Sequence, residues 1–103
     1  MVKELQNQNC DLIVCLSHLG VNTNMPDNDF EIARQVPEID VIIGGHSHEE
    51  MPQPNIVGKT RICQMTNKGK CFGVLTIEDL WFVTYDLWLM TYDLWRYLIT
   101  LKP

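Results

Sequence analysis

A chain of 103 residues has room for one small domain, which buries roughly 60 to 65 per cent of the surface of its unfolded chain. Acidic residues outnumber basic ones by 13 to 8, and the basic residues are scattered, so the sequence lacks the basic patch typical of nucleic-acid binding. No apolar run is long enough for a membrane span, and the N-terminus has no signal-peptide pattern. These features exclude a nucleic-acid polymer as the main partner and leave the compartment unknown.

The first half of the sequence predicts a β-α-β unit after a short helix. Residues 1–9 are rich in helix formers. The apolar run Asp11–Leu16 is typical of a strand that is covered on both faces in a parallel sheet. Asp29–Val36 has a mostly apolar helical face, and Asp40–Gly45 predicts a second buried strand. Strand, helix and strand in this order favour a parallel pair with a crossover helix.

The pattern then changes to a loop and two further strands. Residues 46–59 contain two prolines and predict a loop with a turn at Gly58-Lys59. The segments Thr60–Met65 and Cys71–Glu78 alternate between apolar and polar residues, which predicts an antiparallel hairpin. The expected fold is therefore α/β, a β-α-β unit extended by antiparallel strands, over residues 1–78.

Residues 79–103 differ in composition and predict a separate tail. Residues 84–89 are TYDLWL and residues 91–96 are TYDLWR, and every Trp and Tyr of the chain lies in this tail. Its apolar positions are too many for a coiled-coil seam. A simple seven-nucleotide DNA repeat with one changed base encodes the same pattern, so we expect a tail that is not native to the fold. Such a tail is expected to pack on the sheet, pair with another chain or adhere to a membrane surface.

The four cysteines show no metal-site or redox spacing. Cys10, Cys15, Cys63 and Cys71 form no CxxC pair, and two of them lie in or beside an apolar run where cysteine is commonly a small buried hydrophobe. We expect ordinary thiols, while the sequence leaves open a disulfide between two of them.

Three histidines follow the two predicted parallel strands. His18 lies two residues after the first strand, and His46 and His48 follow the second. The carboxyl ends of parallel strands share one edge of a sheet, so the three imidazoles are expected to converge. Imidazole is a common ligand for zinc and manganese, and Gly44 and Gly45 allow a close backbone approach. The plain alternative for a short His-Ser-His loop is a pair of solvated side chains.

Three segments resemble a known family. CDLIVCLSHLG, IDVIIGGHSHE and QMTNKGKCFGVLTIE are similar to the second half of the metallophosphatase domain of the 5′-nucleotidase family, within the calcineurin-like metallophosphoesterases. The resemblance covers about residues 1–78 and implies part of an α/β/β/α sandwich. It also implies a hydrolase that uses two divalent ions, zinc, manganese or similar, to hydrolyse nucleoside 5′-monophosphates in nucleotide catabolism.

The resemblance implies metal-ligand roles for the three histidines. His18 and His46 match ligands of one ion, and His48 matches a ligand of the other. The family's Asp-x-His, GDxxD and GNHE or GNHD motifs do not occur in this sequence, so it offers no catalytic residue, and the substrate-binding residues stay unknown. We therefore expect at most one weakly bound ion and little or no activity from this fragment alone. An incomplete sheet with an exposed apolar edge is also expected to favour self-association.

The sequence is also compatible with two other functions. A 2′,3′-cyclic-nucleotide phosphodiesterase, or another binuclear metallophosphoesterase, would use the same three histidines. A non-enzymatic alternative is a truncated product or an interaction module that acts through the aromatic tail. Members of the family are typically periplasmic or extracellular in bacteria, but this sequence contains no export signal.

Overall fold

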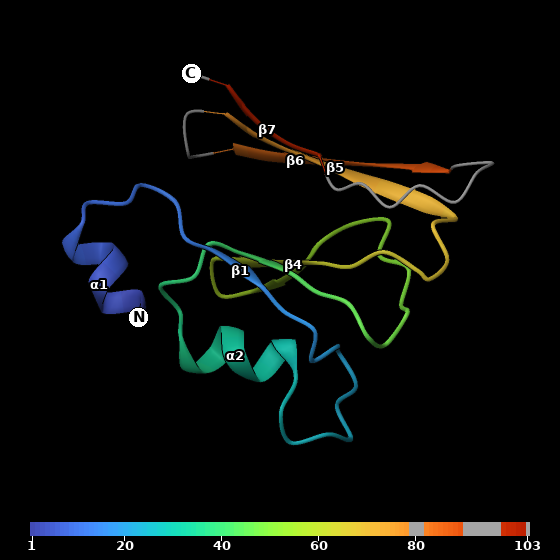
Figure 1. Cartoon of the computed structure of the whole chain (residues 1–103), viewed down its shortest axis with the longest axis horizontal. Coiled ribbons are helices and arrows are strands. Elements are labelled where there is room, and N and C mark those ends of the chain that lie inside the picture. The colour runs from blue at the N-terminus through green and yellow to red at the C-terminus, as the bar shows by residue number, and fades with distance from the viewer. Residues whose placement is uncertain (79–81, 90–97, 103) are drawn as a thin grey trace.

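The computed structural model describes residues 1–78, 82–89 and 98–102 (Figure 1). It has the mixed α/β fold that the sequence predicts. The elements in chain order are α1 (Val2–Asn7), β1 (Val14–Leu16), α2 (Asp29–Gln35), β2 (Val41–Ile43), β3 (Asn55–Val57), β4 (Thr60–Cys63), β5 (Cys71–Glu78), β6 (Phe82–Leu89) and β7 (Leu98–Lys102).

The β-α-β unit is confirmed. β1 and β2 are parallel neighbours, with Val14 paired to Val41, and α2 lies between them in the chain. Asn28 caps α2, because its side chain accepts a hydrogen bond of 3.1 Å from the backbone N–H of Glu31. β4 continues the sheet parallel to β2, and β3 closes it antiparallel to β4, giving the order β1-β2-β4-β3.

The predicted hairpin between residues 60–65 and 71–78 is wrong. β4 pairs with β2 and with β3, a strand formed by residues that the sequence predicts as loop. The turn at Gly58-Lys59 is correct and joins β3 to β4, with Gly58 in a left-handed conformation at φ 59°. Thr60, Ile62 and Cys63 are all buried, as expected for a strand covered on both faces, whereas a solvated hairpin would bury one face.

β5 is the central strand of a second sheet with the order β6-β5-β7. β6 is antiparallel to β5 along its full length, and β7 is parallel to it. The tail therefore contributes two strands that pair with β5 through their backbones. The first copy of the repeat, residues 84–89, lies in β6, and the second, residues 91–96, lies outside the described residues. The division between a domain at 1–78 and a non-native tail stays a prediction.

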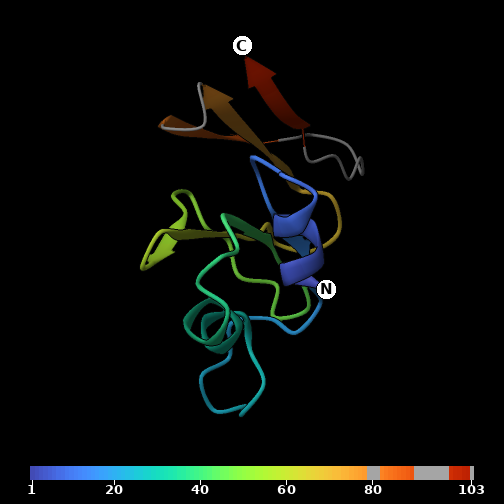
Figure 2. The same ribbon diagram turned by 90° about the vertical axis from the view of Figure 1, so that its left-hand side faces the viewer.

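The two sheets and α2 form three layers (Figures 1 and 2). Successive β2 side chains point to opposite faces, so Val41 and Ile43 pack toward the second sheet and Ile42 packs toward the helices. The core between the sheets contains Val41, Ile43, Cys63, Met65, Cys71, Leu75 and Ile77. The core between the first sheet and the helices contains Ile13, Val21, Ala33, Ile39, Ile42, Met51 and Ile62.

All four cysteines are free thiols, so none of the disulfides that the sequence leaves open is formed. Cys63 and Cys71 are buried between the sheets, and burial raises the pKa of the Cys63 thiol to about 12. Neither of the two short helices in the described residues could serve as a membrane span.

Candidate metal site

The three histidines lie in loops at one edge of the first sheet. The last residues of the three parallel strands, Leu16, Ile43 and Cys63, are in register. The ladder continues one residue further, because the backbone N–H of Ser17 donates to Ile43 at 2.9 Å and that of Gly44 donates to Cys63 at 2.8 Å. Both histidine loops therefore begin at the same height on the sheet.

His18 and His46 are brought together, as the sequence predicts. Their ring centroids are 5.3 Å apart, and the rings meet edge to face at 71°. Gly45 makes this approach possible, since a Cβ at that position would lie 3.0 Å from Nδ1 of His18. Both side chains are exposed, so a ligand can reach them from solvent.

His48 does not join these two rings in a three-ligand group. Its Nδ1 lies 3.2 Å from Nδ2 of Asn67, an amide nitrogen that can only donate, which places the ring proton on Nε2. Turning the Asn67 amide over would move that proton to Nδ1 and leave Nε2 available to a metal ion. Nowhere in residues 1–78, 82–89 and 98–102 do three His, Cys, Asp or Glu side chains form a group that could hold an ion.

Asp29, the first residue of α2, is a buried carboxylate that the sequence pattern does not predict as part of the site. It is 0% exposed. Oδ1 accepts a hydrogen bond from the Ser17 hydroxyl, and Oδ2 has no partner. Burial raises the pKa of this carboxyl group, while the Ser17 hydrogen bond and the nearby His18 imidazole act in the opposite direction. An Asp in the first turn is common because it complements the helix dipole, so nothing in the local pattern singles out Asp29.

The two loops are also tied to each other by hydrogen bonds. The Ser47 hydroxyl accepts from the backbone N–H of Val21 at 3.2 Å, which links the loop after β2 to the loop after β1. Gln64, which is 0% exposed and directly follows β4, places its side-chain amide against Ser47. From the sequence, residues 64–70 could shape the strand edge near the site or simply form part of the predicted hairpin, and neither interpretation predicts that the Gln64 side chain is buried.

These residues fit part of a metal site. His18 and His46 offer two adjacent imidazole donors, and the unpartnered Oδ2 of Asp29 supplies negative charge close to the loop that bears His46. Two imidazoles leave most coordination positions of a divalent ion open. The binding of a single ion and the metal-ligand roles of the three histidines therefore stay predictions.

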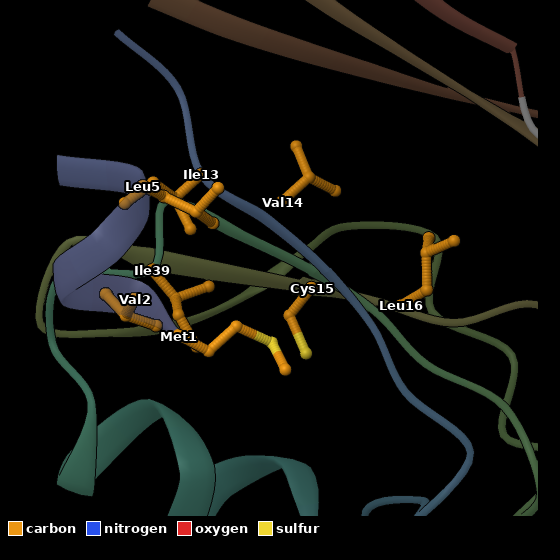
Figure 3. Close-up of a pocket in the computed structure, with 8 residues that line it drawn as sticks. All are labelled: Met1, Val2, Leu5, Ile13, Val14, Cys15, Leu16 and Ile39. Atoms are coloured by element: carbon orange, nitrogen blue, oxygen red, sulfur yellow. The ribbon is translucent and has the colours of Figure 1, made fainter. Parts of the chain in front are cut away.

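A pocket beside α1 and β1 has a different character (Figure 3). No histidine and no charged side chain lines it, and most of its lining is aliphatic. Its lining consists of Met1, Val2, Leu5, Ile13, Val14, Cys15, Leu16 and Ile39.

Comparison with known proteins gives one informative likeness. The chain is 33% identical over 76 residues to the uncharacterized metallophosphoesterase YunD of Bacillus subtilis (strain 168), a match that covers 74% of this chain and 15% of the relative. The chain thus corresponds to a small part of that protein's length. No family model matches the chain, and no solved structure matches it. The likeness supports a metallophosphoesterase-like chain, a class of hydrolases that generally use divalent metal ions, and does not extend to the narrower 5′-nucleotidase family.

Proposed function

We propose that this chain forms the histidine-bearing part of a metal-dependent phosphoesterase whose substrates are nucleoside 5′-monophosphates. The observation that carries the proposal is the approach of the His18 and His46 rings to 5.3 Å at the carboxyl edge of parallel strands. The likeness to a metallophosphoesterase supports the reaction class. The SHLG and GGHSH motifs support the nucleotide substrate through their resemblance to the 5′-nucleotidase family.

The charge of the chain makes a bound cation necessary for this function. The formal net charge is −5, and Glu49 and Glu50 directly follow the histidine loop. A phosphate dianion is repelled by such a surface unless positive charge is held at the site. A divalent cation, when bound, supplies that charge and polarises the phosphate ester. His18 and His46 would hold the cation, and Gly45, where a Cβ would lie 3.0 Å from Nδ1 of His18, leaves room beside that ring.

The described residues provide imidazoles but no carboxylate that groups with them as a ligand. Charge balance in a two-ion centre requires such carboxylates, so we infer that this chain alone binds one ion weakly and turns over phosphate esters slowly or not at all. A carboxylate from another segment or another polypeptide would have to complete the centre.

Isothermal titration with Zn²⁺ or Mn²⁺, beside a phosphatase assay, tests this proposal. We expect the wild-type chain to bind one ion weakly. Loss of an outer-shell partner typically lowers metal affinity by about 10- to 100-fold, and we expect His46→Ala to lower it by more than that. His48→Ala is the matched control, since His46 contacts the His18 ring whereas Nδ1 of His48 faces Asn67, so the loss of His48 should change this affinity little.

Adenosine 5′-monophosphate and a 2′,3′-cyclic nucleotide are compared as substrates in the same assay. Binding that is unchanged in His46→Ala would refute the metal site. Rapid turnover by the wild-type chain would refute the slow-turnover proposal, and preference for the cyclic substrate would refute the 5′-monophosphate assignment.

A further inference from the structure

The buried amide of Gln64 contacts the backbone of the loop that bears His46 and His48. With its oxygen facing the loop amides, Gln64 accepts from the N–H of His48 at 3.1 Å and of Glu49 at 2.6 Å. Its Nε2 donates to the carbonyl of Gly45 at 2.9 Å and to the hydroxyl of Ser47 at 3.0 Å. This orientation of the amide matches every donor with an acceptor, which is the basis for choosing it.

Ser47 extends this contact to the loop that bears His18. Its hydroxyl accepts from the Val21 N–H at 3.2 Å. Gly20 packs directly against it, because a Cβ on Gly20 would lie 3.1 Å from the Cβ of Ser47. The Gln64 amide therefore reaches both loops, one directly and one through Ser47.

The loop needs such support because of its backbone conformation. His46 and His48 have φ values of 72° and 55°, in the left-handed region that is unfavourable for residues with a Cβ. Such conformations persist only where the surroundings fix them. Both rings are exposed, so packing around the rings does not supply this constraint. The buried amide beneath the loop does.

We propose that Gln64 and Ser47 are positioning residues that hold the His46 ring against the His18 ring. Neither residue needs to touch a metal ion to do this. The consequence for metal binding rests on the proposed function, whereas the consequence for loop geometry does not. The two parts can therefore fail separately.

The test compares Gln64→Met with Gln53→Met by NMR in the absence of metal. Met is similar to Gln in length and removes the amide hydrogen bonds, and Gln53 is an exposed loop residue of the same type. In wild type we expect an NOE between the His18 and His46 rings and protection of the His48 amide from hydrogen exchange. In folded Gln64→Met we expect the NOE to vanish and exchange at the His48 amide to accelerate. Gln53→Met should resemble wild type.

An unchanged NOE and unchanged exchange in folded Gln64→Met would overturn the proposal. If Gln64→Met does not fold, Ser47→Ala decides, because it removes a single hydroxyl that is only half-buried. Faster exchange at the Val21 amide with loss of the ring NOE supports the proposal, and wild-type behaviour at both overturns it.

Zn²⁺ titration of the same variants separates this proposal from the metal site itself. For a positioning residue we expect affinity to fall by roughly 10- to 100-fold in Gln64→Met, the range typical of outer-shell partners. If wild type binds no Zn²⁺, the proposed function fails while the NOE and the exchange rates still decide the positioning role.

Discussion

Replacing Gly44 by Ala should destabilise the chain by forcing the buried carboxylate of Asp29 to move. A Cβ at Gly44 would overlap Oδ2 of Asp29 and would lie 3.5 Å from its Cγ, against an ordinary contact of 3.4–4 Å. Asp29 is fully buried at the start of α2 and accepts the Ser17 hydrogen bond, so it cannot swing into solvent. The carboxylate must therefore shift by about an ångström or the β2 end must open.

The expected loss for Gly44→Ala is about 2 to 4 kcal/mol in the free energy of unfolding. Overpacking costs roughly 1 to 3 kcal/mol. Complete loss of a hydrogen bond to a charged group costs about 1.5 to 3 kcal/mol, and a weakened bond between Ser17 and Asp29 costs part of that. The reduced freedom of the unfolded chain offsets about 0.4 to 1 kcal/mol. Gly44 is not in the left-handed region, so backbone strain adds nothing.

Urea unfolding followed by circular dichroism, with chelator present, measures this loss. Gly58→Ala is the matched control, because a Cβ there meets nothing within 4 Å and its cost comes only from the left-handed backbone at φ 59°. Combining Gly44→Ala with Asp29→Ala should bring the cost of the Gly44 change below about 1 kcal/mol, since the obstructing carboxylate is gone. Equal costs in both backgrounds would refute the placement of Asp29 against Gly44.

Three further predictions concern pH, thiol chemistry and the His48 tautomer. Burial raises the pKa of Asp29 above 3.8, so the contribution of this carboxyl group to stability is complete below that pH and is lost as pH rises through the folded pKa. In metal-free unfolding experiments, the gain in stability of Asp29→Asn over wild type should therefore be largest at neutral pH. An equal gain at pH 3 would contradict this. Iodoacetamide at pH 8 should label the exposed Cys10 quickly, and should label the buried Cys63, whose pKa is about 12, only when the chain unfolds. Peptide mapping measures the two rates, and equal rates for Cys10 and Cys63 would contradict this prediction. Asn67→Asp replaces the amide donor that faces His48 with a carboxylate acceptor, so the His48 ring proton should move from Nε2 to Nδ1. The ¹⁵N chemical shifts of the imidazole report this change, and unchanged shifts would show that Asn67 does not set the tautomer.

The elements with strong local patterns were predictable from the sequence. Asp29–Val36 has a helical apolar face, and the helix observed ends one residue earlier, at Gln35. The runs around β1 and β2 are continuous and apolar, and their parallel pairing follows from the short crossover helix between them. The convergence of His18 and His46 then follows from topology alone, because parallel strands end at one edge.

The features that the sequence did not predict depend on contacts between residues that are distant in the sequence. Residues 60–65 alternate well enough for a hairpin, but their pairing with β2 is decided by the unfilled edge of the parallel sheet. Asp29 and Gln64 each occupy a position where a polar residue is normally solvated. Their burial arises from the loops that close over them, which a local pattern cannot encode. The left-handed backbone of His48 likewise depends on the hydrogen bonds of Gln64.

The proposed site requires His18 and His46 to bind one ion together. The most direct test is a titration of the ¹⁵N-labelled chain with Zn²⁺, followed through the imidazole nitrogen shifts of all three histidines. A pair of rings 5.3 Å apart should respond together, so one nitrogen of His18 and one of His46 should move with the same midpoint. His48 should lag behind them or stay unchanged. Independent midpoints for His18 and His46, or a response of only one of them, would contradict a shared metal site.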